Sequence, residues 1–148
     1  MTYLLDVSTL LALLWENHAH HSRVKAWESG EQIAVCPITE LGFLRISTQA
    51  FNATMEDARR SLSTWLAKRN PQFLPCDERV LAGRTAPTGG KTTDFYLAHL
   101  AQAHGMKFVT LDENIALWVA ENPSSSKKQR AGVAQCVSVS TLAVDPSK

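Results

Sequence analysis

Residues 2–12 read TYLLDVSTLLA, and this stretch decides the fold of the chain. Its apolar run at residues 3–5 does not alternate with polar residues, which is typical of a strand that is buried on both faces. Ser8 then offers an N-cap for a leucine-rich helix that is predicted to run to about Trp15. Asp6 lies at the junction, at the carboxyl end of the strand, and open parallel sheets bind their ligands at this edge.

The composition predicts one soluble globular domain spanning residues 1–148, because 45% of the residues are apolar and 20% are charged. The formal net charge of +1 favours no class of partner. The apolar N-terminus lacks a preceding basic region and contains an acid, so it does not resemble a signal peptide and we expect a cytoplasmic protein without membrane contact. Three widely spaced cysteines without a CxxC pair argue against a thiolate zinc site and predict buried thiols: Cys36, Cys76 and Cys136.

A second strand is predicted at residues 33–35, and Pro37 closes it because proline cannot continue a strand ladder. The segment PITELGFLRIS follows as a helix, with Thr39 as its expected N-cap and Glu40 in its first turn. The helix dipole alone accounts for many acids in a first turn. Alternatively, Glu40 follows the second strand as Asp6 ends the first, which would put both acids on one edge of the sheet. The two interpretations are equally good at this point.

The middle of the chain predicts an amphipathic helix over residues 54–68 and a short strand over residues 72–76. A loop, GRTAPTGGK, then leads into a helix over residues 94–104, with Asp94 in its first turn. The end of this loop resembles a phosphate-binding loop. We reject a nucleoside triphosphatase, because Thr85 stands where the GxxxxGK[ST] pattern requires glycine.

The last strand–helix unit repeats the arrangement of the first. KFVTL, residues 107–111, predicts a buried strand, Asp112 follows at once, and a further helix is expected after it. Thr110 shares the strand face of Asp112, so its hydroxyl can donate a hydrogen bond to an acid or to a water molecule. Residues 137–139 could add an edge strand.

Four acids lie at a strand end or a helix start, and such junctions meet at one edge of a parallel sheet: Asp6, Glu40, Asp94 and Asp112. Carboxylates that converge repel each other by about 4 kcal/mol per close pair at an intermediate dielectric constant. Protonation or a divalent cation must relieve this repulsion. Ligands that are all oxygen favour Mg²⁺ or Mn²⁺ over zinc. One or two such ions suit the hydrolysis of a phosphodiester by metal-activated water.

Four segments, in this order, carry a family resemblance: LLDVSTLLALL, CPITELGFLR, TTDFYLAHLA and FVTLDENI. They resemble the acidic motifs of PIN-domain ribonucleases, and in particular those of the VapC toxins of bacterial toxin–antitoxin pairs. The resemblance implies a three-layer α/β fold in which helices flank a central, mostly parallel sheet of four to five strands. It also implies an Mg²⁺- or Mn²⁺-dependent endoribonuclease toxin that forms a homodimer and is inhibited by a VapB-like antitoxin.

The resemblance assigns catalytic roles to the acids Asp6, Glu40, Asp94 and Asp112. Asp6, Asp94 and Asp112 resemble the metal-binding acids, and Glu40 resembles the acid that completes the cluster. Ser8 and Thr110 match small hydroxyl positions that orient acids or water.

Basic residues near the acids could offset the charge of RNA phosphates. Arg45 follows Glu40 on the same predicted helix, and Arg84 and Lys91 lie in the loop before Asp94. The basic segment at residues 123–131 could also contact RNA, although a solvated loop explains it equally well.

Two alternatives remain open. A haloacid-dehalogenase-type phosphatase also begins with a strand and an Asp nucleophile, but its DxDx[TV] pattern requires a second Asp where this chain has Ser8. The other alternative is a catalytically inactive PIN module that binds RNA or a protein.

Overall fold

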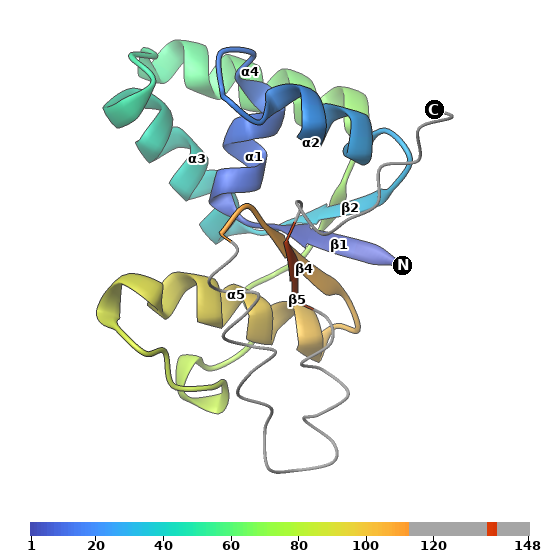
Figure 1. Cartoon of the computed structure of the whole chain (residues 1–148), viewed down its shortest axis with the longest axis vertical. Coiled ribbons are helices and arrows are strands. Elements are labelled where there is room, and N and C mark those ends of the chain that lie inside the picture. The colour runs from blue at the N-terminus through green and yellow to red at the C-terminus, as the bar shows by residue number, and fades with distance from the viewer. Residues whose placement is uncertain (113–135, 139–148) are drawn as a thin grey trace.

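The structure is a computed structural model that describes residues 1–112 and 136–138 of the chain. Within these residues, five strands form a fully parallel sheet in the order β3-β2-β1-β4-β5 (Figure 1). The strands are β1 (Thr2–Leu5), β2 (Gln32–Val35), β3 (Gln72–Phe73), β4 (Lys107–Thr110) and β5 (Cys136–Ser138). The first strand of the chain therefore lies at the centre of the sheet, as expected of a strand that is buried on both faces.

Helices cover both faces of this sheet. They are α1 (Val7–Leu14), α2 (His21–Glu28), α3 (Pro37–Ala50), α4 (Met55–Arg69) and α5 (Thr92–Ala103), with 3₁₀ turns η1 (Val80–Ala82) and η2 (Gly89–Lys91) before α5. Figure 1 shows α1 to α4 on one side of the sheet and α5 on the other. The predicted three-layer α/β fold is confirmed.

Central strand β1 contributes to two separate cores. Successive side chains of a strand point to opposite faces. Leu5 accordingly packs among the side chains of α1 to α4, including Phe43, whereas Leu4 packs with α5 side chains such as Leu100. All four of these side chains are fully buried. This burial on both faces fixes the direction of β1 and, with it, the place where its last residue meets α1.

The predicted N-cap at Ser8 is wrong. Helix α1 begins at Val7, and Asp6 is its N-cap, because the Asp6 carboxylate accepts a hydrogen bond from Thr9 N at 2.7 Å. Aspartate is among the preferred N-caps, and its side chain satisfies an amide that the helix itself leaves without a partner. The acid that ends the strand thus also starts the helix.

The predicted N-cap at Thr39 is also wrong. Helix α3 begins at Pro37, where the missing proline N–H is harmless because first-turn amides have no partner within the helix. The Thr39 hydroxyl instead donates to the carbonyl of Leu5 at 2.8 Å. It therefore ties the start of α3 to the end of β1.

Three further boundaries differ from the sequence prediction. Helix α5 begins at Thr92, so Asp94 is the third residue of the helix and not the first. The strand predicted over residues 72–76 ends at Phe73, and beyond it Cys76 is exposed, not buried as expected. The edge strand begins one residue earlier than predicted, at Cys136. The helix expected after Asp112 and the basic segment at 123–131 lie outside the described residues.

An ion pair joins the last residue of α2, Glu28, to the last residue of α4, Arg69. Arg69 Nε donates to Glu28 Oε1, and the same guanidinium donates to the backbone carbonyls of Glu28 and Glu31. The side chain of Glu28 is 5% exposed and that of Arg69 is 31% exposed. A buried carboxylate is tolerated only when a partner of opposite charge or several donors meet it.

Within the described part of the chain, no helix has the length and hydrophobicity of a membrane span.

We predict that Arg69→Met lowers the free energy of unfolding by about 3 kcal/mol, because it leaves the Glu28 carboxylate buried without its cation. Arg60→Met, on the same helix, is the matched control: Arg60 pairs with the exposed Glu56 at 2.8 Å, and such surface pairs contribute less than about 1 kcal/mol. Urea denaturation measures both changes. Equal losses in the two variants would contradict this role of Arg69.

Candidate active site

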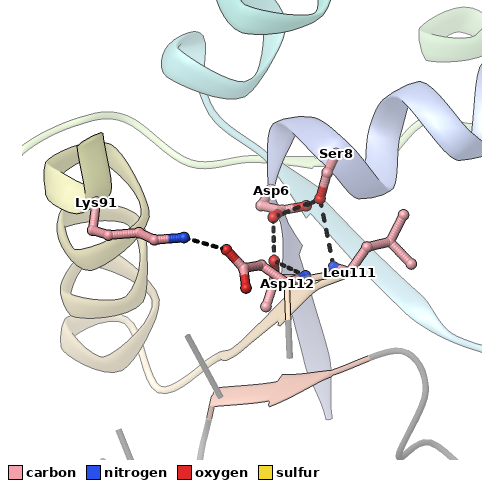
Figure 2. Close-up of polar contacts among 6 residues, drawn as sticks. Asp6, Ser8, Lys91, Leu111 and Asp112 are labelled. Atoms are coloured by element: carbon pink, nitrogen blue, oxygen red, sulfur yellow. Dashed lines mark hydrogen bonds and ion pairs between the residues drawn. The ribbon is translucent and has the colours of Figure 1, made fainter. Parts of the chain in front are cut away.

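Hydrogen-bond donors surround the carboxylate of Asp6 at the junction of β1 and α1. The residue is 3% exposed. The Ser8 hydroxyl lies 2.9 Å from both carboxylate oxygens (Figure 2). Thr9 N donates to Oδ1 at 2.7 Å, and the Thr110 hydroxyl donates to Oδ2. Burial raises the pKa of Asp6, while the hydrogen bonds from Thr110, Thr9 and Ser8 lower it in part.

Two hydroxyl groups connect the end of β1 to the end of β4. Thr110, which is fully buried, donates to Asp6 and accepts a hydrogen bond from Asp112 N at 3.0 Å. Ser8 Oγ accepts one from Leu111 N at 3.4 Å (Figure 2). The hydrogen bond that the sequence led us to expect from Thr110 to an acid is therefore present. These bonds set the path of the backbone that carries Asp112.

The pKa of Asp94 is affected by the charges of its neighbours. It lies in the first turn of α5, on the other face of the sheet from α1. Burial and the negative charges of Asp6 and Asp112 raise the pKa of Asp94 to about 6, while the positive charge of Lys91 opposes this rise. Three acids from β1, α5 and the end of β4 thus share one electrostatic environment.

Lys91 forms an ion pair inside this environment. Its Nζ lies 2.6 Å from Asp112 Oδ2, and the two side chains are 34% and 30% exposed (Figure 2). The carboxylate of Asp112 and the charge of Asp94 both raise the pKa of Lys91. Lys91 therefore neutralises part of the negative charge of the acids.

Glu40 has a different setting. It lines a groove of about 700 Å³ between α3 and α4, together with residues such as Leu41 and Arg59. Burial raises the pKa of Glu40, and among the described residues no other acid contributes to that shift. The structure thus brings Asp6, Asp94 and Asp112 into one electrostatic environment, while the membership of Glu40 in this cluster stays a prediction.

The candidate RNA-binding residues are distributed unevenly around the site. Lys91 contacts an acid directly. Arg84 lines a separate cavity of about 430 Å³ beside the start of α5, with Phe95 and Tyr96. Arg45 is exposed on α3, beyond Glu40. The sequence prediction did not include Thr9, whose backbone N–H donates a hydrogen bond to the Asp6 carboxylate. The sequence does contain a signal for it, because an Asp directly before a helix commonly accepts a hydrogen bond from the N–H of the third helical residue.

The residues fit a hard divalent cation by the chemistry of their donors. Among the residues that the structure describes, no three His, Cys, Asp or Glu side chains form a group that could hold a metal ion as they stand. The neighbouring acids nevertheless offer only oxygen ligands, and the negative charges of Asp6 and Asp112 add to the effect of burial on the pKa of Asp94, which indicates an excess of negative charge around it. A cation at Asp94 and Asp112, next to Asp6, would relieve this excess, and Mg²⁺ and Mn²⁺ prefer such ligands.

We predict that Asp94→Asn raises the melting temperature of the metal-free protein at pH 7.5. The folded-state pKa of about 6 exceeds the unfolded value of about 3.9, so the folded state binds more protons in between. Stability is therefore lost as the pH rises from about 4 to about 6, and the amide avoids this loss. The difference from the wild type should vanish near pH 4. Asp57→Asn, on exposed α4, should show no gain, and an Asp94→Asn variant that is no more stable at pH 7.5 would refute the shared environment.

Comparisons with known proteins agree with this arrangement. The profile of the PIN domain matches residues 3–117. Ribonuclease VapC38 of Mycobacterium tuberculosis is 33% identical over 131 residues, which cover 82% of this chain and 93% of the relative. Ribonuclease VapC44 of the same organism is 34% identical over 142 residues, covering 88% and 99%. Ribonuclease VapC39 is 33% identical over 128 residues, covering 78% and 92%. The chain therefore belongs to the PIN-domain family and is a member of its VapC type.

Proposed function

We propose that this protein is an Mg²⁺- or Mn²⁺-dependent endoribonuclease and the toxin of a toxin–antitoxin pair. The observation that carries the proposal is the electrostatic coupling of Asp6, Asp94 and Asp112 at the carboxyl edge of a parallel sheet. The relatives that cover most of the chain are named ribonucleases, which supports RNA as the substrate.

In the proposed mechanism, Asp6, Asp94 and Asp112 are the residues that would hold the cation. A bound Mg²⁺ or Mn²⁺ supplies positive charge that lowers the pKa of an attacking water and offsets the charge that develops on the phosphate. Asp6 contributes a preorganised carboxylate, because Ser8, Thr9 and Thr110 already fix its orientation. Such preorganised charges need not reorganise during the reaction.

Glu40 is proposed to complete the acidic site from helix α3, which follows the neighbouring strand β2. Strand β2 pairs with β1 in parallel, so α3 leaves the sheet at the same edge as α1. Glu40 lies in the first turn of α3 and its pKa is raised by burial. Glu40 would therefore add a fourth carboxylate at the edge of the sheet where β1 and β2 end.

The basic side chains are proposed to bind the RNA backbone. Lys91 is closest to the acids, and Arg84 precedes it on the same loop. Arg45 would extend this path along α3. Phosphate contacts of this kind position the substrate without reading its sequence.

The proposed partners follow from the family. A VapB-like antitoxin is the expected inhibitor, and a basic side chain from it would suit a site in which three acids are coupled. We also propose a cytoplasmic homodimer, on the resemblance to VapC toxins.

The alternatives receive less support. A phosphatase with Asp6 as nucleophile needs an accessible carboxylate, whereas Asp6 is 3% exposed and three residues already donate hydrogen bonds to it. A catalytically inactive binding module is not favoured, because the relatives that cover most of the chain are named ribonucleases.

We predict that expression of the wild-type protein arrests bacterial growth, and that Asp94→Asn abolishes the arrest and slows cleavage of RNA in vitro by about 100-fold or more, because an electrostatic group of the reaction is lost. EDTA should stop the wild-type enzyme. Asp57→Asn should stay toxic and active. Because Asp94→Asn is expected to be stable, loss of activity in it cannot be attributed to unfolding; a variant as active as the wild type would overturn the proposed site.

A further inference from the structure

Lys91 lies where two elements of the site approach each other. Its backbone N–H donates to the Thr88 carbonyl at 3.1 Å, which closes the 3₁₀ turn η2 immediately before α5. From there its side chain extends to Asp112, at the end of β4 (Figure 2). Asp94 follows three residues later, in the first turn of α5. Lys91 thus contacts Asp112 and senses the charge of Asp94, two of the acids that are proposed to hold the cation.

We propose that Lys91 is a positioning residue that competes with the divalent cation for Asp112 and moves to an RNA phosphate when the cation binds. The inference rests on the proposed function, because it assigns two alternating partners to a residue of that site. Without a cation, Lys91 neutralises Asp112. With a cation bound, the same ammonium group contacts the substrate backbone.

The competition follows from the distances. The ammonium nitrogen lies 2.6 Å from Asp112 Oδ2, and Mg²⁺ binds its oxygen ligands at about 2.1 Å. Two cations on one carboxylate at such distances repel each other strongly. The ion and the ammonium group therefore cannot share Oδ2 of Asp112, and their like charges weaken the binding of either one to this carboxylate.

The Lys91–Asp112 pair is also built to open. The pair between Arg69 and Glu28 is its contrast within the chain: the Glu28 side chain is 5% exposed, and Arg69 also donates to two backbone carbonyls. In the Lys91–Asp112 pair, both side chains are about one-third exposed, at 34% and 30%. Lysine carries a compact charge on a flexible stem of four carbons, so it can leave a carboxylate without a change in the backbone.

The backbone position of Lys91 limits which groups its ammonium can contact after it leaves Asp112. Lys91 is fixed at the start of α5, next to Asp94. A phosphate that approaches a cation on Asp94 and Asp112 must therefore come within reach of Lys91. A single lysine–phosphate contact releases counterions and makes RNA binding more dependent on salt.

The test compares Lys91→Met with the wild type in two binding measurements. Titration calorimetry with Mn²⁺, without RNA, should show binding at least about fivefold tighter in the variant, because the competing charge is gone. Fluorescence anisotropy with a labelled single-stranded oligoribonucleotide, with Ca²⁺ in place of Mg²⁺, should show weaker binding and a salt dependence that is reduced by about one charge.

Two controls separate this role from a structural one. Lys91→Arg keeps the positive charge beside Asp112 and should therefore bind Mn²⁺ no more tightly than the wild type. Lys107→Met removes a lysine at the other end of β4, where Nζ lies 5.9 Å from the centre of the Tyr3 ring, and should change neither. A Lys91→Met variant that has only lost structure would bind both Mn²⁺ and RNA more weakly.

The outcomes distinguish the inference from the proposed function. If the wild type cleaves RNA and Lys91→Met binds Mn²⁺ no more tightly than the wild type, the exchange at Asp112 is overturned and the nuclease stands. If the wild type cleaves no RNA although Lys91→Met still binds Mn²⁺ more tightly, the nuclease is overturned and the competition at Asp112 stands.

Discussion

The hydrogen bonds around the Asp6 carboxylate are the interaction on which the rest of the site depends. Asp6 ends the central strand, and its carboxylate is nearly inaccessible to water. A carboxylate in that position is tolerated because Thr9, Ser8 and Thr110 donate to it. The same bonds start α1 and link β1 to β4. The hydrogen bonds that shape this edge of the sheet are therefore the same ones that place its acids.

This arrangement gathers negative charge, and Lys91 offsets part of it within the described residues. Asp94 and Asp112 join Asp6 from other elements, and Lys91 forms an ion pair with Asp112. Such a site has reduced stability without a counterion, and a ligand that binds only the folded state stabilises it. Both a divalent ion and a basic side chain from an inhibitor meet this need, so the catalytic and the inhibited states would draw on the same excess of charge.

Much of this edge could be predicted from the sequence, because each strand–helix junction has a local signature. The apolar run before Asp6 and the run before Asp112 identified two parallel strands, and parallel strands end at the same edge. The errors arose where one residue has two roles. Asp6 both follows the strand and caps α1, whereas the sequence pattern predicts Ser8 as the N-cap.

The position of Glu40 depends on packing between helices, which local patterns do not encode. Helix α3 approaches α1 so closely that a Cβ added at Gly42 would lie 2.4 Å from a methyl group of Val7. Only glycine permits this contact without a shift of its neighbour, and the contact sets where the first turn of α3 lies. Cys76 was misjudged for a similar reason: cysteine is usually buried, but this one follows a strand of only two residues, Gln72–Phe73.

The most direct measurement is the anomalous diffraction of a crystal of the protein grown with Mn²⁺. If acids from separate elements form one cation site, the anomalous peak lies between the carboxylates of Asp94 and Asp112, next to Asp6, and Lys91 Nζ no longer contacts Asp112. A peak elsewhere on the molecule, or no peak at a saturating concentration of Mn²⁺, would contradict the account.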